Sequence, residues 1–131
     1  MNKEQVEMLG EYIKAGKSNI LIEEIPESVI ERGAIVIEAN CSNADLMGHY
    51  ENDKFQAPEW YKKLIETKSP ILVIKNINLI PEEEQRKFIE LFKYKKMYVH
   101  KLPENCMIFA TYNNLDEKPI EEELYSFMIH I

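Results

Sequence analysis

Five short apolar segments recur along this chain of 131 residues, and they constrain its fold more than any other feature. Their centres lie near residues 20, 36, 73, 108 and 129, and the run ILVI at 71–74 is apolar at every position. Strands that are apolar on both faces belong to parallel sheets whose two faces are covered by helices. Segments with helical spacing separate the five runs. The sequence therefore predicts an α/β fold, a three-layer αβα sandwich with a five-stranded, mainly parallel sheet.

The segments between the strands carry helix and turn signals. Residues 2–16 show helical spacing of apolar residues, and Asn2 can cap the start of this helix while Gly16 can end it. The other predicted helices are 25–33 (two turns at most), 57–69, 81–96 and 119–127. The polar stretch 42–55 is predicted to be a loop with local turns, and 97–102 an exposed strand or hairpin arm. With no repeat or linker, we expect a single domain over residues 1–131.

Composition and charge exclude several classes of function. A net charge of −7 argues against a nucleic-acid module, which needs clustered lysine and arginine. The basic cluster KYKK at 93–96 stands at the end of a helical pattern. There its positive charges are explained better by interaction with the helix dipole than by phosphate binding. No apolar run approaches the ~20 residues of a membrane span, and the charged N-terminus is unlike a signal peptide. We expect a cytoplasmic protein that does not contact a membrane.

The cysteines and histidines do not indicate a metal site. Cys41 and Cys106 stand alone inside apolar segments, which favours two buried free thiols over a disulfide or a metal pair. His49, His100 and His130 lack ligand spacing and are expected to be surface or strand residues. We therefore predict neither a metal nor a cofactor.

The order of the pieces from 71 to 127 is informative. A core strand ends in Lys75-Asn76, a helix follows PEEEQ, a short hairpin precedes the strand that ends in ATYN at 110–113, and PIEEELYSF closes the series. Upstream stands NCSNADLMG at 40–48. This arrangement resembles the core of AAA+ ATPases, most closely the MoxR and dynein/midasin-like branch. The resemblance implies a P-loop NTPase fold, with a phosphate loop, two Walker B carboxylates, a sensor asparagine, an arginine finger and a helical lid.

The phosphate loop of that family does not match this chain. A Walker A loop reads G-x-x-x-x-G-K-[ST], because its glycines let backbone N–H groups surround the phosphates. AGKS at 15–18 lies before the first strand, and Gly10 is six residues ahead of Gly16 where the motif needs five. After the first strand stands IPESVIERG at 25–33, with no glycine before Gly33 and no lysine. The resemblance therefore implies that this loop has been lost.

The other catalytic positions of the family carry different residues in this chain. Lys75 and Asn76 align with the two Walker B acids, but lysine does not ligate Mg²⁺ and asparagine is no general base. Asn113 matches the sensor asparagine, or it caps the turn after its strand. Ser126 stands at the arginine-finger position, and we expect no helical lid after the last strand. These four positions are vestigial in this interpretation.

Lys75 has two interpretations at the carboxyl end of its strand. It is either a relocated phosphate ligand or a salt-bridge partner of Glu23, Glu24 or Asp45, which would replace the charge of a lost Mg²⁺. The acidic surroundings favour the salt bridge. We therefore expect Lys75 to restore the charge balance at an inactive site.

Two classes of function follow. The first is a catalytically inactive, AAA+-like interaction or regulatory module that binds a protein partner, such as an active AAA+ relative. Its candidate contacts are Phe55, Trp60, Tyr61, Tyr98 and His100, although such aromatic residues, and Trp60 above all, more often belong to the core. The second class is an ATPase or ATP-binding protein completed by a partner subunit. A clamp-loader-like DNA-processing accessory is a third alternative, which the acidic charge disfavours.

Overall fold

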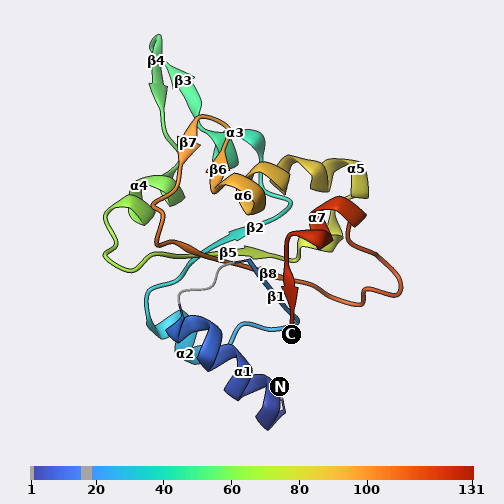
Figure 1. The fold of residues 1–131 in the computed structure, drawn as a ribbon. Coiled ribbons are helices and arrows are strands. Elements are labelled where there is room, and N and C mark those ends of the chain that lie inside the picture. Colours follow the sequence, from blue (N-terminus) through green and yellow to red (C-terminus); the bar gives the residue numbers. More distant parts are fainter. Residues whose placement is uncertain (1, 16–18) are drawn as a thin grey trace.

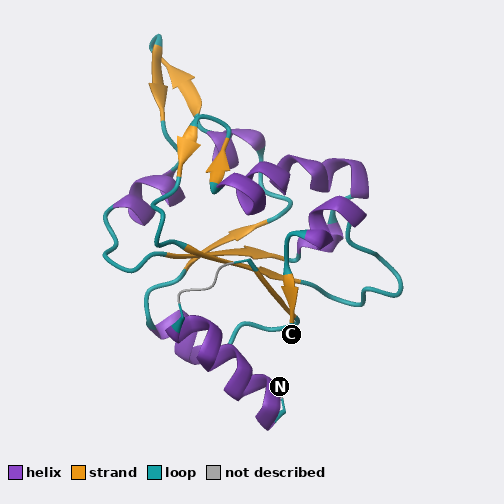
Figure 2. Ribbon diagram, in the orientation of Figure 1, coloured by secondary structure: helices purple, strands orange, loops and turns teal. Residues whose placement is uncertain are grey.

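The protein is described by a computed structural model over residues 2–15 and 19–131 (Figures 1 and 2). The helices are α1 (Lys3–Lys14), α2 (Glu27–Glu31), α3 (Asn43–Met47), α4 (Glu59–Ile65), α5 (Glu82–Gln85), α6 (Ile89–Tyr94) and α7 (Glu122–Ser126), with 3-10 turns η1 (Ile77–Leu79) and η2 (Arg86–Phe88). The strands are β1 (Ile20–Ile22), β2 (Ile35–Glu38), β3 (His49–Glu51), β4 (Lys54–Gln56), β5 (Ile71–Lys75), β6 (Lys96–Met97), β7 (His100–Lys101), β8 (Met107–Thr111) and β9 (Ile129–His130).

The five predicted strands form the central sheet. Its order is β2-β5-β8-β1-β9, and every neighbouring pair in it is parallel. The interior strands β5 and β8 are buried along nearly their whole length, as their continuous apolar runs require. The edge strand β2 alternates between half-buried and exposed positions, and Val36 is 44% exposed there. The predicted α/β fold is therefore confirmed, with one strand less enclosed than its sequence indicates.

Helices cover the two faces of the sheet unequally. The helices α3, α4, α5, α6 and α7 lie on one face, and α1 and α2 lie on the other (Figure 1). Because side chains alternate along a strand, Leu72 and Ile74 enter the first core while Ile71 and Val73 enter the second. The first core contains 19 buried residues and the second contains 8. Two layers of helices thus enclose the sheet, and one of them is thin.

The first helix begins where the sequence predicts. The Asn2 side chain accepts a hydrogen bond from the Gln5 backbone at 2.8 Å, and the Gln5 side chain accepts one from the Asn2 backbone at 2.9 Å. This capping box satisfies two of the free N–H groups at the start of a helix. The predicted end of the helix at Gly16 lies outside the described residues. None of the described helices has the length and apolar character needed to cross a bilayer.

The segments 42–55 and 81–96 differ from their predictions. The first is not a loop: Ser42 caps α3 by accepting from the Asp45 backbone at 3.1 Å, and the hairpin β3–β4 follows. Its two-residue turn, Asn52-Asp53, has two positive φ angles, which suit these residue types. The second segment is not one continuous helix, because the 3-10 turn η2 separates α5 from α6.

The two cysteines are free, and their burial differs from the prediction. Cys106 is fully buried, and this burial raises the pKa of its thiol to about 11. Cys41 is only half-buried, because it follows the edge strand β2 and not an interior strand. The expectation of two buried thiols is therefore correct for Cys106 and wrong for Cys41.

Candidate functional site

The carboxyl ends of β1 and β8 meet at the place where ligands bind in open α/β sheets. These two strands are neighbours, with Leu21 paired to Ala110. The helix after β1 packs Val29 into the smaller core, and the helix after β8 packs Leu124 into the larger one. The two loops therefore leave the sheet toward opposite faces, which is the arrangement found at ligand sites in open α/β sheets. We take this carboxyl edge as the first candidate site.

The loop after β1 carries exposed acidic side chains and no glycine or lysine. Glu23 and Glu24 are exposed, Pro26 precedes α2, and no glycine occurs before Gly33. The following helix has only 5 residues. Burial raises the pKa of the neighbouring Tyr112 hydroxyl, and the negative charge of Glu23 raises it further. The electrostatic character of this loop is therefore anionic, which opposes the binding of a triphosphate.

The end of β5 is occupied by an ion pair. The Lys75 ammonium lies 3.7 Å from a Glu38 carboxylate oxygen, and the Asn76 amide lies 3.5 Å from the other oxygen of Glu38. The predicted partners of Lys75 (Glu23, Glu24 and Asp45) are wrong. Lys75 and Glu38 are register partners on the adjacent strands β5 and β2, whereas β8 separates β5 from β1. The strand order, which local sequence does not reveal, decides the partner.

Asn76 holds an unusual backbone position beside this pair. Its φ of 58° lies in the left-handed region, which asparagine tolerates better than most residues. Its backbone N–H donates to the Thr111 hydroxyl at 2.9 Å, which ties the end of β5 to the end of β8. Asn76 therefore acts as a structural turn residue in the described contacts.

Asn113 lies at the end of β8, but its side chain is not the group that organises the loop. Asn113 is exposed, and its backbone carbonyl and N–H both bond to the buried side chain of Asn78. The Asn78 amide also donates to the Lys118 carbonyl at 2.7 Å. Asn78 was not identified from the sequence. The available signal was a single polar residue inside the apolar run Ile77 to Ile80.

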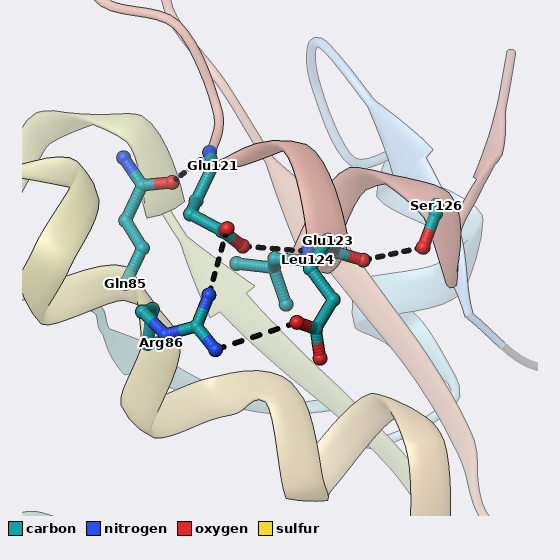
Figure 3. A network of polar contacts seen from close by, with 6 residues as sticks. All are labelled: Gln85, Arg86, Glu121, Glu123, Leu124 and Ser126. Atoms are coloured by element: carbon teal, nitrogen blue, oxygen red, sulfur yellow. Dashed lines mark hydrogen bonds and ion pairs between the residues drawn. The ribbon is translucent and has the colours of Figure 1, made fainter.

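The buried amide of Gln85 and the guanidinium group of Arg86 bind residues 119–123 (Figure 3). Gln85 donates to the Ile80 and Pro119 carbonyls at 3.0 and 3.2 Å, and its oxygen accepts from the Glu121 backbone at 2.7 Å. Arg86 reaches across to Glu121 at 2.9 Å and to Glu123 at 3.3 Å. Neither residue was identified from the sequence, because their partners lie about 35 positions away along the chain.

Glu121 and Ser126 complete the network in Figure 3. The Glu121 carboxylate caps α7 by accepting from the Leu124 N–H at 2.8 Å. This bond, a contact with the Glu123 N–H and the charge of Arg86 hold the pKa of Glu121 below its ordinary value. The Ser126 hydroxyl donates back to the Glu123 carbonyl at 2.5 Å within α7. In the described contacts Ser126 therefore serves its own helix.

A second candidate site lies at the two hairpins, where all five predicted aromatic contacts meet. The ring of His100 stacks on Phe55 at 5.6 Å and contacts Tyr61 at 4.8 Å between ring centroids. Tyr98 lies 6.4 Å from both Phe55 and His100. Trp60 joins the cluster through Tyr61 at 5.7 Å. The structure therefore brings these five side chains into one continuous aromatic cluster, although they are up to 45 positions apart in the sequence.

The members of this cluster divide into core and surface. Trp60 is buried and donates its indole N–H to the Leu46 carbonyl at 2.9 Å. His100 is also buried, and its Nε2 lies 2.7 Å from the Met47 carbonyl oxygen. Tyr98 is 54% exposed, together with its neighbour Val99 at 61% and Tyr50 on the other hairpin at 73%. We define Tyr50, Tyr98 and Val99 as the hairpin surface.

Tyr98 also occupies a backbone position that is costly for its residue type. It is the first residue of the two-residue turn Tyr98-Val99, where its φ is 55°. Glycine is favoured at such a position because a side chain crowds the backbone there. The other hairpin places Asn52 and Asp53 in its turn, which follows the rule. A strained aromatic residue at an exposed hairpin tip suggests a role for its side chain.

The described residues provide no grouping of three or more histidine, cysteine or acidic side chains suited to a metal ion. No protein-family model matches the sequence, and no curated protein matches it either. Solved structures do match. A crystal structure of NtrX from Brucella abortus has a TM-score of 0.61 and 14% sequence identity, and the match covers 100% of this chain and 37% of that one.

A second structure of NtrX from Brucella abortus, in complex with ADP, has a TM-score of 0.56 and 18% identity, over 87% of this chain and 31% of the other. The parallel five-stranded sheet with helices on both faces agrees with the three-layer core that the sequence predicted. These matches show that this chain shares the α/β fold of part of the NtrX structures. At 37% and 31%, the matches span about a third of each NtrX chain.

Proposed function

We propose that this protein is a catalytically inactive AAA+-like module that acts through protein interaction or regulation and does not bind nucleotide. The placement near the MoxR and dynein/midasin-like branch belongs to the same proposal, and it rests on the order of segments from 40 to 127. The partner in this proposal is a cytoplasmic protein, such as an active AAA+ relative.

The loop after β1 carries this proposal. A phosphate loop needs backbone N–H groups that converge on the ligand and a long helix that points its positive N-terminus at it. Here the connection contains Glu23 and Glu24 and leads to a helix of 5 residues. An AAA+-like fold with this loop retains the sheet but lacks the group that holds the β- and γ-phosphates.

The other positions support the same proposal. The salt bridge between Lys75 and Glu38 occupies the strand end where the family holds Mg²⁺. The hydroxyl of Ser126 stands where the family presents an arginine, and it bonds within its own helix. Lys75 and Ser126 thus each have a partner within the chain, so neither side chain needs a nucleotide to complete its contacts.

The hairpin surface is the proposed contact with the partner. Tyr50 of β3 and the turn residues Tyr98 and Val99 between β6 and β7 are exposed, and the hairpin β3–β4 projects from the molecule (Figure 1). Tyrosine is favoured in interface hot spots. The strained conformation of Tyr98 supports this assignment. Trp60 and His100 support the surface from beneath and are not proposed as direct contacts.

Calorimetric titration with Mg-ATP and Mg-ADP tests the first half of the proposal. We expect no saturable heat and no change in melting temperature with either nucleotide. Binding at 100 times the Kd would stabilise the native state by about 2.7 kcal/mol, a shift that a melting curve resolves. Saturable binding together with a higher melting temperature would show that the chain is a nucleotide-binding protein.

Capture experiments with matched variants test the contact surface. The triple variant Tyr50→Ser, Tyr98→Ser, Val99→Ser removes only exposed side chains, so we expect its circular dichroism and melting to stay close to wild type. The control variant Ile65→Ser, Tyr94→Ser removes apolar residues that are 53% and 62% exposed elsewhere. We expect the control and the wild type to capture the same partner from the source cell, and the triple variant to lose it. Equal capture by all three proteins would place the contact elsewhere.

A further inference from the structure

The thinly covered face of the sheet carries a groove between its two helices. The groove has a volume of about 560 Å³. Its lining comes from α1, from α2 and from the two residues that flank α2: Val6, Leu9, Gly10, Ile13, Lys14, Pro26, Ser28, Val29 and Arg32. Figure 1 shows these two helices beneath the sheet, with α1 at the outside. Val6 is 52% exposed although it belongs to the apolar side of α1. The short α2 leaves this apolar surface uncovered.

Gly10 is an independent feature of the same groove. It lies in the interior of α1, where glycine is the least favourable residue after proline. A Cβ atom added at Gly10 would meet no atom within 4 Å, so packing inside the chain does not require a glycine. Glycine in a helix permits the close approach of another backbone. Gly10 therefore lowers the stability of α1 without improving the packing of this chain, and a contact with another molecule would explain it.

The spacing along α1 is self-complementary. Val6, Gly10 and Ile13 follow one another at intervals of four and three residues, so they form one row on the helix surface. Two copies of α1 that cross antiparallel at Gly10 place Val6 of one copy near Ile13 of the other. The small central residue lets the two helix backbones approach at the crossing point. A two-fold axis through this point generates an isologous interface.

The charges beside this row fit the same arrangement. Glu7 and Lys14 are seven residues apart, which is close to two helical turns, so they flank the row on one side. Neither residue has an ion-pair partner within the described part of the chain. In an antiparallel pair the same flanks face each other, which brings Glu7 of each copy to Lys14 of the other. Both symmetry-related contacts then join opposite charges.

We propose that the α1–α2 groove binds a second copy of this chain, with the two α1 helices antiparallel and crossing at Gly10. This homodimer is independent of the hairpin surface, which lies on the opposite side of the sheet (Figure 1). Its contact is small, and we expect a reversible association.

Sedimentation equilibrium of the full chain from about 1 μM to about 1 mM covers the Kd range of transient complexes and tests this proposal. We expect the wild type to move from monomer to dimer within this range. The variant Gly10→Ala should raise the melting temperature of dilute, monomeric protein by about 2–5 °C, because alanine favours the helix. The same variant should weaken the dimer, because the added methyl groups meet at the crossing point. Gly10→Leu should abolish the dimer.

Charge reversal tests the orientation of the helices. Lys14→Glu should raise the dimer Kd about tenfold or more, because it places two acidic side chains opposite each other. The double variant Glu7→Lys, Lys14→Glu should restore the wild-type Kd. Met8→Leu, a change on another side of α1, serves as the control and should leave the Kd unchanged.

Three results would overturn the proposal. One is a wild type that stays monomeric over the whole concentration range. Another is a dimer that Gly10→Ala leaves unchanged. The third is a lower melting temperature of dilute Gly10→Ala, since this would show that the chain's own packing requires the glycine.

Discussion

The loops that follow the neighbouring strands β1 and β8 lie at the same edge of the sheet, but they differ in how many contacts from the rest of the chain fix them. After β1, the side chains of Glu23 and Glu24 are exposed and form no ion pair among the described residues. After β8, the segment 112–121 is fixed by the buried amides of Asn78 and Gln85.

This difference bears on how the fold persists without a ligand. In a working nucleotide site, the loop after the first strand binds phosphate, and the residues after the fourth strand respond to it. Here the first loop lacks a cradle, while the second is held by hydrogen bonds from within the chain. A loop that is satisfied by buried side chains needs no ligand to be ordered. The stability of this edge should therefore depend on the amides and be nearly independent of the acidic loop.

Removing Asn78 should have the largest effect on this comparison. Asn78→Ala removes a buried amide that makes three hydrogen bonds, and the backbone groups of Asn113 and Lys118 lose that partner. We expect the free energy of unfolding to fall by about 3 kcal/mol, as measured by urea denaturation. The control Asn105→Ala removes one exposed bond to the Lys68 carbonyl and should cost less than about 1 kcal/mol. Equal losses would show that the segment after β8 is not held by this amide.

Removing Arg86 should have a smaller effect. Arg86→Ala breaks the contacts with Glu121 and Glu123, but the guanidinium side chain is 52% exposed, so solvent screens both. We expect a loss of about 1 kcal/mol by the same measurement. Arg86→Lys should recover only part of it, because an ammonium group does not form the same forked contact. Full recovery with lysine would mean that net charge, and not the geometry of the fork, stabilises α7.

The strands and the local caps could be predicted from the sequence because their causes lie within a few residues. The run at 71–74 predicts a buried strand, and Asn2 predicts a helix start. The contacts that shape the candidate site depend on strand order. Lys75 faces Glu38 because β2 is the neighbour of β5, and a single sequence does not state this order. The predicted salt bridge therefore had the right chemistry and the wrong partners.

The buried amides were missed for a related reason. In the sequence, Asn78 is a polar residue between apolar neighbours and Gln85 is an ordinary polar residue of a predicted helix. Both lie against residues 113–121, to which they are hydrogen-bonded. The hairpin β3–β4 had a local signal, since Asn52-Asp53 is a suitable two-residue turn. The aromatic contacts were predicted as a group. Their division into buried Trp60 and His100 and exposed Tyr98 required the packing of the two hairpins.

The pH dependence of stability sharpens the comparison further. The pKa of Glu121 is lowered in the folded state by the Leu124 N–H first, and also by the Glu123 N–H and Arg86. A lowered folded-state pKa means that the carboxylate stabilises the fold above its ordinary pKa of about 4.3. This contribution is lost as pH falls through the lowered value. The stability difference between wild type and Glu121→Gln should therefore narrow as pH falls from 7 toward about 3. A difference that is constant with pH would rule out the carboxylate as its source.

The smallest effect on stability is expected from the acidic loop itself. The double variant Glu23→Gln, Glu24→Gln changes two exposed side chains, so the free energy of unfolding should change by less than about 0.5 kcal/mol. Neutralising Glu23 should lower the pKa of Tyr112 toward its ordinary value, because Glu23 is one of the causes that raise it. NMR titration of protein with ¹³C-labelled tyrosine rings would follow this change.

Within the proposal that this chain does not bind nucleotide, the same variant separates charge from backbone geometry as the reason. If repulsion by the two glutamates alone excluded nucleotide, the neutral variant would bind Mg-ATP. We expect it not to bind, because a phosphate cradle needs converging backbone N–H groups, and the segment from 23 to 32 has no glycine to form them. Saturable binding by the double variant in calorimetry would show that the site is intact and only masked by charge. Its absence, together with the lowered pKa of Tyr112, would locate the loss in the shape of the loop.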